Sequence, residues 1–417
     1  MSTYHALFRH RGYLAFWLGQ VTSVIGNGIR LVALPALILQ SHSGKTYAYV
    51  LAADAFFSVV LMLLGGAFAD RHSRTGLMAL SDVIRAIAVL GYLTFGPQSA
   101  LAPLLLCAAL AGTGSALFQP AHRAALPQIV PAELRQKANS LDGATNSLGL
   151  AAGAGLGGVL VASVGPRWAL LFDVATFMVS LLTLLWIRLP GVAAPSVKAA
   201  SPSIFAEIKE GAREVRRRAW VWTIMLQGTL QLLLVFAPYS VLVPVASADR
   251  YGYVAYGWIS ASGSLGMIIG SALAGRVTTA RPGLWAMNAL TPAALFVWCL
   301  AVDVPLAVFC VCAFLGWVGI GIFVVFWFTA LQKEFPQEVQ GRVFALESVV
   351  TFGLNPVAFA LTPLVADRVG LTAFAAIAVA MLIASNYVVL LVPGAITLST
   401  PTAVKEPAES NAAELTT

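Results

Sequence analysis

Charged side chains stand inside long apolar stretches of this sequence, and their types and spacing point to specific chemistry. Asp82 and Arg85 are three residues apart, which places both on the same face of a helix. They can therefore pair and lower the free-energy cost of burying each charge. We interpret them as a structural or gating pair rather than as a substrate site.

Three other acidic residues in apolar stretches have no obvious local partner of opposite charge: Asp54, Asp142 and Glu347. A carboxyl group away from bulk water can take up and release a proton as its exposure changes, which proton-coupled transport requires. These three residues are our candidates for proton coupling. The alternative, which stays open, is that they bond to backbone or loop groups. Asp173, near the end of another apolar stretch, we interpret as structural.

Arg30 lies deep in the first apolar stretch, where an unpaired arginine is costly, so we expect it to face a central cavity. Pairing with a neighbouring helix is the alternative. Ligand sites are mostly apolar with a few polar anchors, so amides and tryptophans in other apolar stretches are further candidates. They are Gln20, Asn27, Gln227, Gln231, Asn288 and Asn355, with Trp17, Trp258 and Trp327. The same groups can instead stabilise contacts between helices.

The elements that must position these residues are membrane-spanning helices. The chain of 417 residues is 59% hydrophobic and only 10% charged, too little polar surface for a soluble protein of this size. Crossing the hydrocarbon takes about 20 apolar residues, and twelve such stretches occur. We expect spans near 14–39, 47–69, 75–96, 99–121, 137–162, 167–189, 219–246, 253–275, 283–302, 305–331, 342–366 and 371–393.

The net charge of +7 reports orientation rather than nucleic-acid binding. If the N-terminus is cytoplasmic, 19 of the Lys and Arg residues outside the spans or at their ends fall on the cytoplasmic side and four on the other. The positive-inside rule then predicts a cell-membrane protein with both termini on the cytoplasmic side. We expect no nucleic-acid partner and, because no Gly-x-x-x-x-Gly-Lys-Ser/Thr loop occurs, no ATP.

Sliding the sequence against itself by 205 residues produces matches without a gap, such as Cys107 with Cys312 and Gly114 with Gly319. Asp142 and Glu347 also coincide. We infer an all-α membrane protein of two pseudo-symmetric six-helix bundles in parallel orientation. The expected parts are a cytoplasmic arm (1–13), an N-terminal bundle (14–189), a cytoplasmic linker (190–218), a C-terminal bundle (219–393) and a disordered tail (394–417).

Within the linker, Ser203 to Arg218 is either an amphipathic helix on the anionic membrane surface or a solvated segment. The fifth span has glycines that leave a ridge almost without side chains, which allows close contact with a neighbouring helix. They are Gly149, Gly153, Gly157 and Gly158.

The pattern Gly66-x-x-x-Asp70-Arg71-x-Ser73-Arg74 resembles the loop signature of the major facilitator superfamily, with Ser73 in place of the usual Gly and Thr75 in place of a basic residue. In that family the acid caps the start of the eleventh helix and pairs with a basic residue of its own loop. The resemblance implies that Asp70 and Arg74 hold the two halves together on the cytoplasmic side. It also implies the twelve-helix fold.

The stretches Phe118–Ala121, Leu126–Glu133 and Gly341–Leu346 resemble the bacterial drug and siderophore exporter branch. The loop Thr279–Leu284 is similar to the matching loop of the enterobactin exporter subgroup. A glycine-rich fifth helix is associated in the superfamily with exchange of substrate for protons, though Ala154 stands where Pro is usual. The resemblance implies export of a hydrophobic or amphipathic small molecule by proton antiport.

Import of a small polar nutrient by proton symport is the alternative function. A membrane enzyme would need a nucleophile and base or a soluble catalytic domain, and we expect neither. We expect no cofactor and no metal, and a protein that acts as a monomer within the lipid bilayer.

Overall fold

The computed structural model describes residues 7–69, 73–96, 100–187 and 204–400. Within these ranges the chain is helical and has no β-strand. The first half contains α2 (Arg11–Leu39), α3 (Gly44–Ala69), α4 (Arg74–Phe95), α5 (Leu101–Ile129), η1 (Ala132–Leu134), α6 (Arg135–Ser163) and α7 (Pro166–Ile187). The second half contains α9 (Ala219–Gln231), η2 (Leu232–Phe236), α10 (Ala237–Tyr251), α11 (Tyr253–Ala274), α12 (Pro282–Leu290), α13 (Ala293–Trp298), α14 (Leu306–Glu334), α15 (Gln337–Phe352), α16 (Asn355–Val369) and α17 (Leu371–Val389).

Eleven helical segments in the described ranges are long and apolar enough to cross a membrane, counting α9–α10 and α15–α16 as one segment each. The twelfth crossing is made by α12 and α13, which are separated at Thr291 and Pro292. Proline lacks a backbone N–H and clashes with the preceding turn, so it interrupts a helix. The expected twelve-span fold is thereby confirmed, with the ninth span divided into two short helices.

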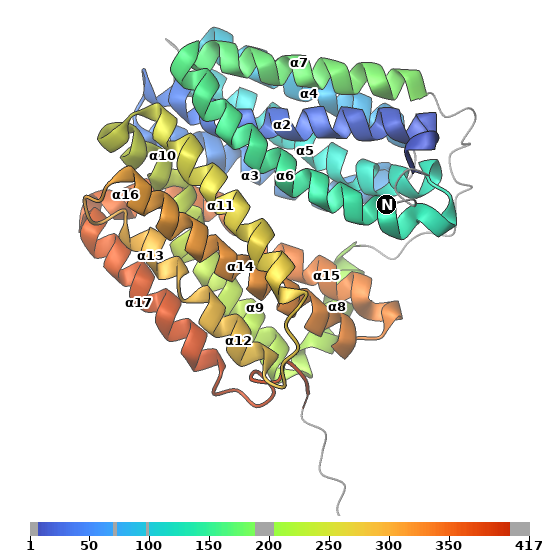
Figure 1. Ribbon diagram of the computed structural model, residues 1–417, viewed down its shortest axis with the longest axis vertical. Coiled ribbons are helices and arrows are strands. Elements are labelled where there is room, and N and C mark those ends of the chain that lie inside the picture. The colour runs from blue at the N-terminus through green and yellow to red at the C-terminus, as the bar shows by residue number, and fades with distance from the viewer. Residues whose placement is uncertain (1–6, 70–72, 97–99, 188–203, 401–417) are drawn as a thin grey trace, which may run out of the picture.

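The two halves repeat each other at the predicted offset of 205 residues. Helix α5 covers 101–129 and α14 covers 306–334, each displaced by that number at both ends. The turns that follow also match, since Gly165 has φ +88° and Gly370 has φ +81°, a left-handed conformation that favours glycine. Figure 1 shows the helices of each half gathered into one bundle.

We call the end of the molecule where α2 begins the basal end, and the end where α2 stops and α3 begins the distal end. The halves meet mainly along two helix pairs, α6 with α11 and α3 with α16, with smaller contacts of α10 with α2 and α3 and of α11 with α2. In Figure 1 the bundles lie close together at the distal end and diverge toward the basal end, where the N label stands. The two bundles therefore form a V.

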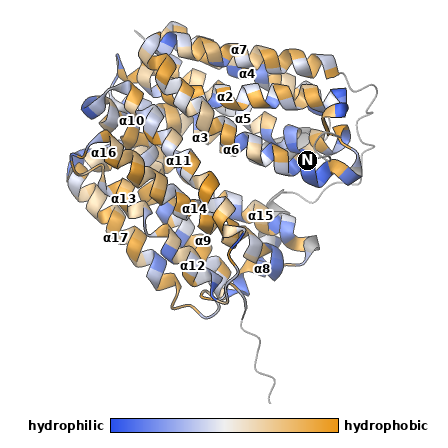
Figure 2. Cartoon of the chain, in the orientation of Figure 1, coloured by the Kyte–Doolittle hydropathy of each residue, from blue (hydrophilic) through white to orange (hydrophobic). Residues whose placement is uncertain are grey.

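Hydrophobic residues predominate along the helices of both bundles (Figure 2), and many of the large ones are exposed. Leu182 and Trp186 on α7 are 65% and 64% exposed, and Leu391 after α17 is 82% exposed. Exposed apolar surface of this extent suits contact with lipid rather than with water.

The linker helix α8 (Ile204–Arg216) packs against α15 of the second half. Arg342 Nη1 lies 2.8 Å from Glu210 Oε1, and a Cβ added at Gly211 would lie 2.7 Å from the Arg342 carbonyl oxygen. The helix that the sequence suggested as one alternative for residues 203–218 is therefore present over Ile204–Arg216 and packs against α15, while its contact with the membrane surface stays a prediction.

The residues that follow α17 differ from the expectation of a disordered tail beginning at Gly394. Ala395 and Leu398 are buried, and the Ile396 carbonyl oxygen accepts hydrogen bonds from the Gly283 and Leu284 amides. Residues 394–400 are thus ordered against the second half, because they close the basal side of its core. Residues 401–417 lie outside the described ranges.

Candidate functional site

Arg30 pairs with Asp173 across the interface of α2 and α7. Arg30 Nε lies 3.4 Å from Asp173 Oδ2, and Arg30 Nη2 donates to Asn27 Oδ1 at 3.0 Å. The Asp173 side chain is fully buried, whereas that of Arg30 is 18% exposed. Arg30 is therefore held from one side by a buried counter-ion, which the sequence had not connected to it because the two residues are 143 positions apart.

Asp82 and Arg85 form a buried ion pair on α4. The Arg85 guanidinium lies 4.3 Å from the ring centre of Phe118 and 4.6 Å from that of Phe177, so two aromatic faces contact the cation. A Cβ added at Gly114 would lie 2.5 Å from Arg85 Cγ. The pairing that the spacing predicted is present, and its surroundings come from α5 and α7.

Asp54 on α3 stands near the same group of charges. Its Oδ1 is buried and has no hydrogen-bond partner among the described residues. Arg30 is the cation that acts on it electrostatically. Asp54, Asp82 and Asp173 together with Arg30 and Arg85 thus form a cluster of buried charges from four helices of the first half.

The second half has no counterpart of this charge cluster at the equivalent positions, 205 residues later. Arg30, Asp82, Arg85 and Asp173 correspond to Val235, Met287, Leu290 and Ala378, all buried and apolar. Instead, Gln227 and Gln231 both donate to Asn386 Oδ1, at 2.8 and 2.9 Å. The two halves share a fold but carry different polar interiors.

These hydrogen bonds bear on the candidate cavity residues. Gln227 and Gln231 are 4% and 3% exposed, so in this structure they join α9 to α17 and do not face open space. Asn288 lies elsewhere, exposed on α12, where it accepts a hydrogen bond from the Tyr387 hydroxyl at 3.2 Å. Gln20 Oε1 and Asn355 Oδ1 are buried without a hydrogen-bond partner in the described ranges.

Asp142 has a partner that the sequence did not reveal. His122 Nε2 on α5 lies 3.0 Å from Asp142 Oδ1 on α6. The His122 ring is stacked on Phe16 and Phe118, at centroid distances of 5.0 and 5.6 Å. The statement that Asp142 lacks a partner of opposite charge is thus corrected, since a histidine on the neighbouring helix supplies one when protonated.

Glu347, the residue equivalent to Asp142, is 7% exposed on α15. Thr351 donates to Glu347 Oε1 at 3.1 Å, and the Trp327 indole is also within hydrogen-bonding reach. Its partners are neutral, whereas the partner of Asp142 can become charged.

Only part of the loop motif at residues 66–74 falls within the residues that the structure describes. Gly66 lies in α3, and Asp70 and Arg71 lie outside the described residues. Ser73 caps α4 by accepting a hydrogen bond from the Gly76 amide at 3.0 Å. Arg74 Nη1 donates to the Ala124 carbonyl oxygen on α5 at 2.6 Å, which ties the loop to the end of that helix.

Three of the glycines on the fifth span face α2: Gly149, Gly153 and Gly157. A Cβ added at Gly153 would lie 2.2 Å from the Ile25 carbonyl oxygen, and one at Gly157 would lie 2.9 Å from Ile29 Cα. The backbones of α6 and α2 therefore touch directly, which only glycine permits at these positions.

Comparison with known proteins identifies the family. Residues 16–358 match the model of the Major Facilitator Superfamily. The chain belongs to this superfamily. It is 28% identical over 378 residues to the multidrug efflux pump Tap of Mycolicibacterium fortuitum, covering 87% of this chain and 91% of that protein. It is 23% identical to the macrolide efflux protein A of Streptococcus pyogenes, covering 86% and 90%, and 28% identical to the enterobactin exporter EntS of Shigella boydii, covering 81% of each.

Solved structures show the same fold. A bacterial homologue of the iron transporter ferroportin, in an inward-facing state, superimposes with a TM-score of 0.72 at 17% identity, covering 91% of this chain and 98% of that one. The nucleoside transporter NupG superimposes with a TM-score of 0.68 at 12% identity, covering 91% and 98%. Together with the family match and the efflux-protein relatives, this fold makes the protein a multi-pass membrane transporter of the superfamily.

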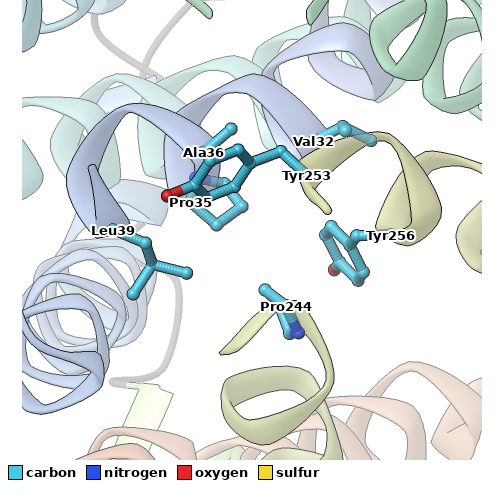
Figure 3. Close-up of a pocket in the computed structure, with 7 residues that line it drawn as sticks. All are labelled: Val32, Pro35, Ala36, Leu39, Pro244, Tyr253 and Tyr256. Carbon is cyan, nitrogen blue, oxygen red and sulfur yellow. The ribbon is translucent and has the colours of Figure 1, made fainter. Parts of the chain in front are cut away.

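In this superfamily member, the contacts between the halves gather at the distal end. Lys45 Nζ lies 2.7 Å from Asp367 Oδ2, and a Cβ added at Gly158 would lie 3.3 Å from Gly257 Cα. Figure 3 shows a shallow recess at the same end, where two prolines and two tyrosines approach from α2, α10 and α11. Its lining residues are Val32, Pro35, Ala36, Leu39, Pro244, Tyr253 and Tyr256.

Proposed function

We propose that this protein exports a hydrophobic or amphipathic small molecule, such as a drug, a natural product or a siderophore, across the cell membrane in exchange for protons. The observation that carries the proposal is the similarity, along most of both halves, to three kinds of efflux protein. The substrates in their names differ widely, from macrolides to enterobactin, so this similarity supports export more than any one compound.

The arrangement of the halves supports alternating access. The distal end is closed by the contacts of α6 with α11 and of α3 with α16, whereas the bundles diverge toward the basal end. If both termini lie in the cytoplasm, as the distribution of basic residues predicts, the basal end is the cytoplasmic end. Rocking of one bundle against the other would then open the distal end and release substrate outside.

We assign proton exchange to three acids whose surroundings differ. Asp54 has an unpartnered buried oxygen, Asp142 bonds to His122, and Glu347 bonds to Thr351. Each can bind a proton when its exposure changes during the cycle. Two of the three acids and the charge cluster lie in the first half, which supports a larger share of the proton exchange in that half, and Glu347 is the candidate in the second half.

Import of a small polar nutrient by proton symport is the alternative. It would use Arg30 as a fixed binding group for an anionic or polar substrate. The pairing of Arg30 with Asp173 weighs against this role, because the guanidinium charge already has a counter-ion.

The test compares cells with and without the protein for susceptibility to macrolides, lipophilic cationic dyes and catecholate siderophores. Export predicts lower accumulation of at least one class and loss of that effect when the proton gradient is collapsed. The matched variants are Asp54→Asn, Asp142→Asn and Glu347→Gln, which keep side-chain size while removing the ionisable group. If all three together leave gradient-driven efflux intact, the assignment of the coupling acids is wrong; higher accumulation in expressing cells would support import.

A further inference from the structure

His122 lies between the partly exposed Asp142 and the charge cluster of the first half. Its side chain is 6% exposed, while that of its partner Asp142 is 28% exposed. On its other side the ring stacks on Phe118, the residue whose ring also contacts the Arg85 guanidinium. A continuous series of contacts therefore runs from Asp142 through His122, Phe118 and Arg85 to Asp82.

The hydrogen-bonding pattern of His122 leaves one ring nitrogen able to gain a proton. An ionised Asp142 carboxylate can only accept, so Nε2 carries the hydrogen that joins the two residues. Nδ1 is then the basic nitrogen, and it is buried without a hydrogen-bond partner among the described residues. Uptake of one proton at Nδ1 turns the neutral ring into an imidazolium and removes the net negative charge of the pair.

We propose that His122 is a proton-binding residue of the transport cycle, with Asp142 as its counter-ion, and that its charge acts on the Asp82–Arg85 pair through Phe118. This proposal deepens the proposed function, since it names a coupling group outside the three acids. Imidazole changes charge near neutral pH, which suits a residue that must bind and release protons on the two sides of a membrane.

His122 is coupled to Arg85 because the Phe118 ring contacts both side chains. The Phe118 ring attracts a cation at its face, and Arg85 is already 4.3 Å from its centre. An imidazolium stacked 5.6 Å away places a second positive charge against the same ring. Protonation of His122 thus weakens the contact that holds Arg85 between α4 and α5. The conformations of the transporter then differ in how favourably they bind the proton, which a conformational shift requires.

Other charged and titratable groups lie on the helices around His122. Tyr13 on α2 has a buried hydroxyl without a partner in the described ranges, and Asp142 acts on it electrostatically. On α4, Arg74 bonds to the Ala124 carbonyl oxygen two residues beyond His122. Asp54 on α3 contacts α5 at Gly112, about 15 Å along the helix from His122. Asp142 is therefore the acid that directly faces the imidazole.

The experiment follows the opening of the basal end without any substrate, so it does not depend on which compound is exported. Spin labels are placed at the exposed residues Gln136 on α6 and Lys333 on α14, in full-length protein whose natural cysteines are replaced by Ala. Distances are measured by pulsed electron resonance in lipid nanodiscs from about pH 5.5 to 8.5, the range in which histidine changes charge.

We expect the distance distribution to shift with pH and His122→Gln to remove at least half of that shift. Asp142→Asn keeps the imidazole but removes its counter-ion, so the midpoint should move to lower pH by about one unit. The matched control is His42→Gln, because His42 Nε2 contacts the Gly96 carbonyl oxygen at the distal end. That variant should behave as the parent.

Two results would overturn the proposal: a parent distribution that does not change with pH, or a His122→Gln protein with the parent midpoint and amplitude. If His122→Gln does not fold, the Asp142→Asn protein tests the proposal instead. An unchanged pH midpoint in that variant would also overturn the proposal. Absence of efflux in cells would instead refute the export proposal and leave this measurement unaffected.

Discussion

Lys45 on α3 and Asp367 on α16 form an ion pair of 2.7 Å that joins the two halves at the distal end. Among the described residues it is the one salt bridge that crosses between the halves. Its symmetry-equivalent residue behaves differently, because Arg250, 205 positions after Lys45, donates to the Cys299, Leu300 and Val302 carbonyl oxygens within its own half. The same position thus closes the transporter in one half and stabilises a loop in the other.

Lys45→Ala and Asp367→Ala should each shift the population toward a state that is open at the distal end, because the pair exists only while that end is closed. Both side chains are about half exposed, so the shift should be small and should shrink further as salt is added. Spin labels at Gln40 and Asp303, both exposed at the distal end, would measure it.

The charge-swapped variant Lys45→Asp/Asp367→Lys is the control for this prediction, since it restores the pair with reversed polarity. We expect it to return the label distances toward those of the parent. Single variants whose distances match the parent at low salt would show that the ion pair does not contribute to closure.

Removing one member of the Asp82–Arg85 pair should destabilise the protein strongly. Asp82→Met or Arg85→Leu leaves the remaining charge buried without its counter-ion, which costs about 3–5 kcal/mol. The double variant Asp82→Met/Arg85→Leu introduces the residues found at the equivalent positions, Met287 and Leu290, which are buried in the same fold. It should recover most of the thermal stability in detergent while transport stays impaired. Normal transport in the double variant would show that the Asp82–Arg85 pair is purely structural.

Much of the fold could be predicted from the sequence because the membrane restricts the solutions. Backbone polar groups in hydrocarbon must bond internally, so a stretch of apolar residues of sufficient length is a helix. The expected span 305–331 became α14 at Leu306–Glu334, and the repeat offset holds for helix ends and for the turns at Gly165 and Gly370. The break at Thr291 and Pro292 was not predicted, because the expected span 283–302 rests on its overall apolarity, which a single proline hardly changes.

The site was less predictable, because its contacts join helices that are distant in the chain. Asp82 and Arg85 could be paired from their spacing, since both are on one helix. The partner of Arg30 is on α7, and the partner of Asp142 is a histidine 20 positions earlier on another helix. The sequence does carry a signal for His122, because it is a histidine inside a long helix with Phe118 one turn before it.

The amide cluster of the second half should be sensitive to Asn386, because its Oδ1 accepts hydrogen bonds from both Gln227 and Gln231. Asn386→Leu, which introduces the residue found at the equivalent position 181, removes that acceptor. Leaving buried donors unsatisfied costs about 1–3 kcal/mol each, so the melting temperature in detergent should fall. Asn288→Leu is the control, since Asn288 is exposed and should change stability little. Equal melting temperatures for the two variants would contradict the role of the cluster.

Three Gly→Ala variants should separate stability within a half from closure between halves. A Cβ at Gly257 would lie 2.7 Å from Gly158 Cα in the other half, so Gly257→Ala should push α11 from α6 and increase opening at the distal label pair. A Cβ at Gly153 would lie 2.2 Å from the Ile25 carbonyl oxygen in the same half, so Gly153→Ala should lower stability by about 1–3 kcal/mol without that opening.

Gly143→Ala is the matched control, because nothing lies within 4 Å of a Cβ added there. It should be neutral or stabilising by about 0.5–1 kcal/mol, since alanine loses less backbone entropy than glycine in a helix. The comparison rests on geometry alone: all three changes add one methyl group to a membrane helix, and they differ only in what that methyl meets. If Gly257→Ala and Gly153→Ala lower the melting temperature equally and leave the distal distance unchanged, the contact of α6 with α11 is not the movable interface of the transporter.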